Sequence, residues 1–453
     1  MEITDQTIQE ENLSQVVSEE NQTQEAPEGN LSQDESEENN GWVLPIYLLL
    51  LLQCSNFFCW LTIPRGYFGH LINIEILFLL YYIFVNRDEV KHIATETLSG
   101  IYVLSFSLLL FVSVIPCYIY HGQSLYDSIK AIWPFTFILF YFVFYKNNIS
   151  EEKLIKLLIT IALIKFVILF VQQFTYPDFW FSAYSEGDID NYGKSYKVEV
   201  RSGIYRYLLG IMYIFYFVGF YLTSKLFNSS NKAKYIVLLG LVFLGIYFEQ
   251  FRYNMVCFLL CWLWMYYMNN KRDISYFQVL TVLFLLYLLY SNFDLLFGDL
   301  KDRTEDDLSD DYIRMLCYSF YLLEYWVGPI TMLFGNGYPL GSSGYGQEIQ
   351  YYQEEFTFFR VDIGIIGTIN IYGIVFLLIL MLFIYRIYKK WRFIDLPYRA
   401  FLIWLALMIP LYMPIHYSSD TNLFMAGLLY LIDKSVDRNK SQDMNPEVYE
   451  ENC

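Results

Sequence analysis

Residues 361–385 read VDIGIIGTINIYGIVFLLILMLFIY and hold one charged side chain, Asp362, near their start. As a helix, such a run crosses a hydrocarbon core of about 30 Å, which takes roughly 20 apolar residues. Runs of similar character recur along the 453-residue chain, which is 56% hydrophobic and 17% charged. A membrane barrel would instead show alternating segments of about 10 residues. The sequence therefore predicts an all-α polytopic membrane protein.

The apolar runs predict about twelve transmembrane helices within a transmembrane domain at 41–433. They lie near 43–63, 67–85, 98–120, 129–145, 154–174, 206–225, 233–249, 252–268, 275–291, 361–385, 398–416 and 421–433, the last being the shortest. Residues 1–40 contain twelve acidic side chains and no Lys, Arg or aromatic residue, a composition typical of a disordered tail. This tail accounts for most of the net charge of −17, and so acidic a chain excludes nucleic acid as a partner.

The distribution of Lys and Arg predicts the orientation, because basic residues are retained in cytoplasmic loops. Basic side chains occur in the loops at 86–97, 146–153, 226–232, 269–274 and 386–397 and in the tail at 434–453. The opposite loops at 64–66, 121–128, 250–251 and 417–420 nearly lack them. We therefore expect a protein of the cytoplasmic (inner) membrane with both termini in the cytoplasm. Two long loops, 175–205 and 292–360, then face outward.

Arginines from separate segments are the first candidates for a binding site. They are Arg201, Arg206, Arg252, Arg314 and Arg360. A guanidinium binds phosphate oxygens in a bidentate fork and keeps its charge, so a cluster of arginines at the outer face suits a diphosphate. The alternative for each arginine is contact with lipid headgroups.

Residues 310–327 of the second loop fit an amphipathic helix. One apolar stripe contains Ile313, Leu316, Cys317, Phe320 and Leu323, and a neighbouring stripe contains Arg314, Tyr318, Tyr321 and Tyr325. Tyrosine rings can stack on sugars, which makes Tyr318 and Tyr321 candidate substrate contacts. The alternative is an interfacial helix whose tyrosines lie at headgroup level.

Carboxylates stand where this loop re-enters the membrane. Asp362, with Glu354 and Glu355 just before it, can take a proton from an attacking hydroxyl or can pair with Arg360 or Arg314. His121 and His416 are expected at the outer face, where a lone histidine is usually structural; a catalytic base at His416 is the alternative.

Other motifs favour structural interpretations. The acidic run at 305–311 lacks the ordered ligand spacing of a calcium loop. Gly335 and Gly337 have neither a preceding strand nor a following lysine at the spacing of a nucleotide loop, so a tight turn explains them. Cys257 and Cys261 have no histidine nearby. We expect no metal and no cofactor.

Three features together resemble the O-antigen polymerase/ligase superfamily, especially Wzy-type polysaccharide polymerases. They are Gln250-Phe251-Arg252, the loop Arg303…Asp310-Asp311-Tyr312-Ile313-Arg314…Trp326…Leu333-Phe334-Gly335-Asn336-Gly337, and the return Asp362-Ile363-Gly364-Ile365-Ile366-Gly367…Tyr372-Gly373. The resemblance covers roughly residues 195–430 and is a pattern of spacing.

The resemblance implies a GT-C-like, metal-independent membrane glycosyltransferase with a large extracytoplasmic loop. It would join repeat units carried on polyprenyl diphosphate, in O-antigen, capsule or exopolysaccharide synthesis. Its arginines would hold the donor diphosphate, matching Arg201, Arg252 and Arg314 here. Membrane lipid is an expected partner, and a chain-length regulator is left open.

One departure separates the branches of the superfamily. The ligase branch carries a His-Asn pair in the large loop, whereas residues 292–360 contain no histidine. A lipid-linked oligosaccharide flippase or other transporter remains an alternative, as does a ligase or another transferase of surface glycans. For the polymerase, the expected catalytic residues are Asp362, Arg314 and Arg252. The expected substrate-binding residues are Arg201, Arg206, Arg360, Tyr318, Tyr321 and Glu355.

Overall fold

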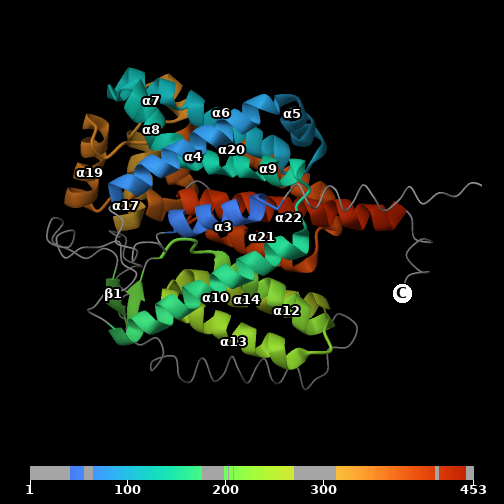
Figure 1. The fold of residues 1–453 in the computed structure, drawn as a ribbon. Coiled ribbons are helices and arrows are strands. Elements are labelled where there is room, and N and C mark those ends of the chain that lie inside the picture. The colour runs from blue at the N-terminus through green and yellow to red at the C-terminus, as the bar shows by residue number, and fades with distance from the viewer. Residues whose placement is uncertain are drawn as a thin grey trace, which may run out of the picture.

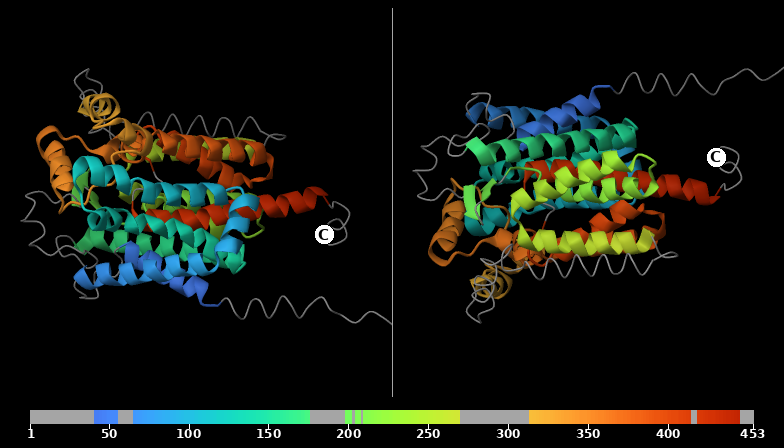
Figure 2. Two further views of the ribbon diagram at one scale, coloured as in Figure 1. Left: turned by 90° about the horizontal axis from the view of Figure 1, so that it is seen from above. Right: turned by 90° about the horizontal axis from the view of Figure 1, so that it is seen from below.

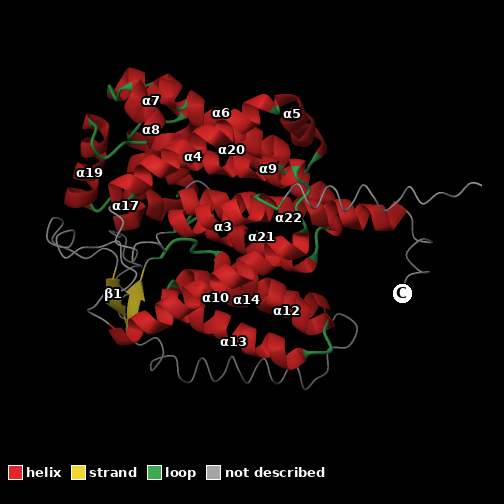
Figure 3. Cartoon of the chain, in the orientation of Figure 1, coloured by secondary structure: helices red, strands yellow, loops and turns green. Residues whose placement is uncertain are grey.

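The computed structural model describes residues 41–55, 65–175, 198–201, 204–207, 209–269, 313–413 and 418–444, and these are mostly helical (Figures 1 and 3). Four stretches are long and apolar enough to cross a membrane: Gly100–His121, Leu125–Lys146, Glu151–Thr175 and Arg360–Phe393. Shorter apolar helices cover Val43–Cys54, Leu71–Val85 and Leu396–Met408. The helical membrane class agrees with the sequence, and the number twelve stays a prediction. The expected helix at 275–291, the acidic run at 305–311 and the tail at 1–40 lie outside the described residues.

The first half of the chain contains α3 (Val43–Cys54), α4 (Arg65–Val85), α5 (Arg87–Glu96), α6 (Gly100–Val112), α7 (Val114–His121), α8 (Leu125–Ile132), η2 (Trp133–Leu139), α9 (Phe140–Lys146), α10 (Glu151–Thr175), β1 (Val198–Arg201), β2 (Ile204–Tyr207), α12 (Ile214–Asn228) and α13 (Lys232–Glu249). The second half contains α14 (Arg252–Asn269), α17 (Ile313–Ser319), η3 (Phe320–Glu324), α18 (Pro329–Phe334), α19 (Gly344–Phe356), η4 (Arg360–Ile363), α20 (Gly364–Lys390), η5 (Trp391–Phe393), α21 (Leu396–Met408) and α22 (Ser419–Met444).

Helix α22 runs through the middle of the bundle (Figures 1 and 2). Its residues 422–433 are all buried. Aromatic contacts join it to helices on both sides. The ring centroid of Phe424 lies 6.0 Å from that of Phe217, and the ring centroid of Tyr430 lies 5.5 Å from that of Phe144. The sequence predicted only 421–433 as the shortest span, whereas the helix has 26 residues. It continues because its polar end packs on the loops around it.

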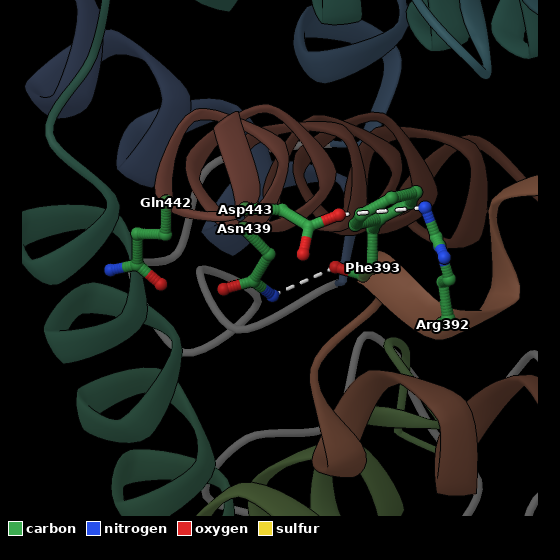
Figure 4. Close-up of a pocket in the computed structure, with 5 residues that line it drawn as sticks. All are labelled: Arg392, Phe393, Asn439, Gln442 and Asp443. Carbon is green, nitrogen blue, oxygen red and sulfur yellow. Dashed lines mark hydrogen bonds and ion pairs between the residues drawn. The ribbon is translucent and has the colours of Figure 1, made fainter. Parts of the chain in front are cut away.

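Two ends of the bundle differ in charge. At one, here called the basic end, the loops 86–99, 146–151 and 391–399 meet the end of α22. Two ion pairs join them, Lys146 with Glu89 at 2.8 Å and Arg438 with Glu151 at 2.7 Å. Arg386 also donates a hydrogen bond to the Thr97 carbonyl at 2.7 Å. A small pocket there is lined by Arg392, Phe393, Asn439, Gln442 and Asp443 (Figure 4).

The opposite end, here called the site end, gathers α7, α8, the β1–β2 hairpin and α17 to α19 (Figure 1). Gln123 fixes this end, because it donates to the Tyr338 carbonyl at 3.1 Å and accepts from Ser343 at 2.6 Å. The described loops expected inside and outside therefore lie at opposite ends of the bundle. Which end faces the cytoplasm stays a prediction.

The hairpin corrects the expected helix at 206–225. Strands β1 and β2 pair antiparallel, with Arg201 opposite Ile204 and Arg206 opposite Glu199, and the helix begins only at Ile214. The stretch VEVR alternates in polarity with a period of two, which is the strand pattern, but it falls within the long loop predicted at 175–205. Arg206 and Tyr207 of the second strand fall within the helix predicted to follow.

A break in α20 seats the large loop on the bundle. Gly373 has φ 76° and ψ −176° within the helix, and the carbonyls of Asn370 and Ile371 accept from the backbone N–H groups of Asn336 at 2.9 Å and Gly337 at 3.0 Å. A Cβ on Gly335 would lie 2.0 Å from the Ile371 oxygen. The glycines therefore serve a close backbone contact between the loop and α20.

This contact predicts the effect of adding a single methyl group. Gly335→Ala and Gly373→Ala should each lower the free energy of unfolding by roughly 2 kcal/mol or more, since positive φ alone costs about 1–3 kcal/mol and both methyl groups meet backbone atoms. Gly341→Ala is the matched control, because its Cβ would meet nothing within 4 Å. Thermal unfolding of the purified chain in detergent measures the difference. Unfolding of both variants at the wild-type temperature would contradict this role.

Candidate functional site

The carbonyl groups at the end of α21 accept hydrogen bonds from three other segments. They accept as follows: Leu407 from the Tyr253 hydroxyl at 2.7 Å, Pro410 from the Tyr318 hydroxyl at 2.6 Å, and Ile409 from the Ile365 N–H at 3.0 Å. The last carbonyls of a helix lack intrahelical partners, so they attract such donors. Three stretches that are far apart in the sequence are thereby fixed at one place.

These three stretches carry the residues expected to perform catalysis. Arg252 begins α14 immediately before Tyr253, and Arg314 lies one helical turn before Tyr318 on the same face of α17. Asp362 precedes Ile365 by three residues, within η4. The structure therefore brings together the segments of Arg252, Arg314 and Asp362. It describes the backbone of Arg252 but not its side chain.

Asp362 also lies close to α17. The pKa of the Cys317 thiol is raised to about 12, chiefly by burial and also by the nearby Asp362 carboxylate. The Arg360 guanidinium lowers this pKa and so opposes both effects. Cys317 is buried and its sulfur lies 3.8 Å from the Phe359 carbonyl. The segment that carries the candidate base is thus packed directly on the segment that carries Arg314.

The hairpin arginines take a different position. Strand β2 packs on α10 and α13, and both backbone groups of Tyr205 bond to the Gln173 amide, at 2.6 and 2.9 Å. Helix α13 ends at Glu249, three residues before Arg252. The hairpin is therefore connected to the α21 end through α13. The side chains of Arg201 and Arg206 lie outside the described part of the structure.

The Arg360 side chain is buried rather than exposed at the surface. Its side chain is 4% exposed, and its guanidinium carbon lies 4.9, 5.2 and 5.6 Å from the ring centroids of Tyr321, Tyr325 and Tyr345. One nitrogen, Nη1, donates to the Tyr345 hydroxyl at 2.9 Å, whereas Nε and Nη2 have no hydrogen-bond partner among the described residues. We call Arg360 and these three residues the tyrosine cage.

The cage changes the interpretation of two expected substrate contacts. Tyr321 is fully buried, and its hydroxyl donates to the Phe358 carbonyl at 3.2 Å. Tyr321 and Arg360 are therefore not accessible from the surface in this structure. The buried face of this segment carries Cys317, Tyr321 and Tyr325, whereas Leu316 and Leu323 of the expected apolar stripe are exposed. A π-helical turn, η3, also replaces the regular helix expected there.

The cage holds a cation in a costly environment. Cation–π contacts give about 2 kcal/mol each when desolvated, while removing an ion from water costs several kcal/mol. Burial raises the pKa of Tyr345, so its phenol stays neutral and donates onward to the Gly337 carbonyl at 3.3 Å. The guanidinium therefore interacts with neutral rings, and no carboxylate of the described residues forms an ion pair with it.

His121 joins the cage from a distant part of the chain. Its ring stacks on Tyr345 at 3.9 Å between centroids, and Nε2 lies 3.1 Å from Asn336 Oδ1. Because the Asn336 amide nitrogen donates to the Tyr325 carbonyl, Oδ1 accepts and Nε2 carries the proton. The other nitrogen, Nδ1, then faces Glu348 Oε2 at 4.0 Å. A contact across 215 residues leaves no local signal in the sequence.

The remaining expected residues are placed more simply. Tyr318 belongs to the α21 contacts, and Glu355 is exposed on α19, at the site end. His416 lies outside the described residues. Among the residues that the structure covers, no group of three His, Cys, Asp or Glu side chains could hold a metal ion.

Comparison of the chain with models of protein families and with curated protein sequences gives no match. The likeness to the polymerase/ligase superfamily therefore depends on the quoted residues alone.

The cage predicts an unusual stability result for Arg360→Met. Methionine fills much of the same volume, leaves no described polar partner unsatisfied and removes a buried charge. Replacement of buried ionic groups by apolar ones is often neutral or stabilising by about 1–4 kcal/mol. The variant should therefore unfold at or above the wild-type temperature, as should the control Arg392→Met, whose side chain is 75% exposed. A large loss of stability in Arg360→Met alone would show that the guanidinium holds the fold.

Proposed function

We propose that this chain polymerises polyprenyl-diphosphate-linked oligosaccharide repeat units at the outer face of the cytoplasmic membrane. The observation that carries the proposal is the meeting of the Arg252, Arg314 and Asp362 segments at the end of α21. Arginine suits phosphate, and a carboxylate beside it suits proton removal from a sugar hydroxyl. The product would be an O-antigen, capsule or exopolysaccharide.

The proposed reaction transfers the growing chain from its lipid carrier to a new lipid-linked repeat unit. A hydroxyl of the acceptor sugar attacks the anomeric carbon of the donor, and the bond from that carbon to the phosphate oxygen breaks. Polyprenyl diphosphate leaves with the bonding electrons, and Asp362 takes the hydroxyl proton. Arg252 and Arg314 neutralise the charge that develops on the leaving group, which lowers the barrier most when the groups are fixed in advance.

The other expected residues would bind the two substrates. Arg201 and Arg206 of the hairpin would hold a diphosphate from the side of α13, while Tyr318 and Glu355 would contact sugar. Opening of the tyrosine cage would add Arg360 and Tyr321. Alignment of two large lipid-linked substrates supplies much of the rate in such a transfer.

The segregation of charge supports the proposed orientation. The basic end contains loops whose Lys and Arg residues favour the cytoplasm, and the site end lies opposite. Both termini would then be cytoplasmic, and the α21 site would open to the outer surface, where repeat units are joined.

A flippase for lipid-linked oligosaccharide is the second candidate. One observation favours it, since Lys165 and Glu249 form a buried ion pair beside the irregular segment at 209–213. Charged groups of that kind mark transport pathways in other membrane proteins. The concentration of expected site residues at one end of the bundle favours the polymerase.

Arginine substitutions test the proposal. Arg252→Ala and Arg314→Ala should each lower long-chain polymer roughly 10-fold or more, since a hydrogen bond to a charged group contributes about 1.5–3 kcal/mol. Single repeat units should accumulate on the lipid carrier. Arg392→Ala, at the basic end, is the matched control and should polymerise normally. Mass analysis of lipid-linked glycans gives the readout, and wild-type chain lengths in both site variants would refute the assignment.

A further inference from the structure

Lys165 is the most deeply buried ammonium group that the structure describes in a membrane-spanning helix. Its side chain is 1% exposed, and Nζ lies 2.5 Å from Glu249 Oε1 and 3.1 Å from the Ile211 carbonyl oxygen. The Phe215 ring lies 5.2 Å away on another side. One ammonium group therefore joins α10 to two other segments at once.

Both of these segments lead to expected site residues. Glu249 is the last residue of α13, and Gln250 follows in the left-handed region with φ 53°, which turns the chain into Arg252 at the start of α14. Ile211 lies between Tyr207, the end of the hairpin that carries Arg201 and Arg206, and Ile214, the start of α12. Lys165 thus binds next to both arginine-bearing segments.

Ile211 is held in a strained conformation from both sides. It is fully buried with φ 55°, a region that a β-branched residue rarely adopts. Its carbonyl accepts from Lys165, and its N–H donates to the buried carboxylate of Asp420 in the first turn of α22. Backbone strain of this kind persists only where the surrounding contacts determine the conformation.

The contacts of Lys165 with Glu249 and Ile211 also lie below the outer end of α10. Lys165 precedes Thr175, the last residue of that helix, by ten positions, which corresponds to about 15 Å. The end of α13 and the segment around Ile211, which Lys165 contacts, therefore lie well below the last residue of α10. A binding site at this depth suits phosphates attached to a membrane lipid better than a soluble nucleotide sugar.

We propose that Lys165 is a positioning residue for a prenyl-diphosphate site, acting through Glu249 on the turn to Arg252 and through Ile211 on the hairpin arginines. This inference rests on the proposed function and names the lipid-attached diphosphate as the group that the site binds. Burying an ion pair gives little net stability compared with apolar side chains. The pair is retained because it fixes the two segments in register.

Binding of farnesyl diphosphate to the purified full-length chain in detergent tests this role. Lys165→Met should weaken binding at least 10-fold. Lys156→Met is the matched control on the same helix, because Lys156 is 71% exposed and pairs with Glu152 one turn away at 2.7 Å. That variant should change the dissociation constant by less than 2-fold.

A double variant separates positioning from stability. Lys165→Met with Glu249→Gln removes both charges, so it should unfold within a few degrees of wild type and still bind farnesyl diphosphate at least 10-fold more weakly. Wild-type affinity in the double variant, or loss of the fold in both variants, would overturn the positioning role and leave the proposed function standing. If the wild-type chain does not bind the probe, the proposed function and this inference both fail.

Discussion

The position of the large loop depends on one backbone contact, the pairing of Asn336 and Gly337 with the open carbonyls beside Gly373. A regular helix would satisfy those carbonyls internally and offer nothing to the loop. The broken helix instead receives the loop, and the buried Asn336 side chain extends the contact to Tyr325 and Asn370. Helix α17 and the tyrosine cage are seated by this arrangement, so the geometry of the candidate site follows from it.

Two buried cations illustrate how the bundle uses charge. Arg360 is surrounded by neutral aromatic rings within the loop, while Lys165 has a carboxylate partner between helices. Neither arrangement is an efficient source of stability, since desolvation offsets most of the attraction. Each instead joins separate segments. Arg360 connects η4 with Tyr321, Tyr325 and Tyr345, and Lys165 connects α10 with the segments around Arg252 and the hairpin.

The helical membrane class was predictable because a long apolar run favours a membrane-spanning helix and a basic loop favours one side of the membrane. The separation of the described loops into two ends follows from that pattern, whereas the meeting of the Arg252, Arg314 and Asp362 segments depends on tertiary contacts at the end of α21. The hairpin was missed because residues 198–205 fall within the long loop predicted at 175–205, and Arg206 and Tyr207 within the helix predicted to follow. The roles of His121 and Lys165 could not be predicted, since each depends on contacts with distant residues. Tyr321 was interpreted as a substrate contact, whereas the structure turns it, together with Tyr325, towards Arg360.

The lipid-linked glycans of a strain that lacks this chain test the central claim most directly, when they are analysed by mass and by membrane leaflet. The proposed polymerase predicts single repeat units on polyprenyl diphosphate at the outer leaflet and no longer products. Repeat units trapped at the inner leaflet would instead identify a flippase. Long polymer still attached to the lipid carrier would indicate a ligase, and either result would contradict the polymerase.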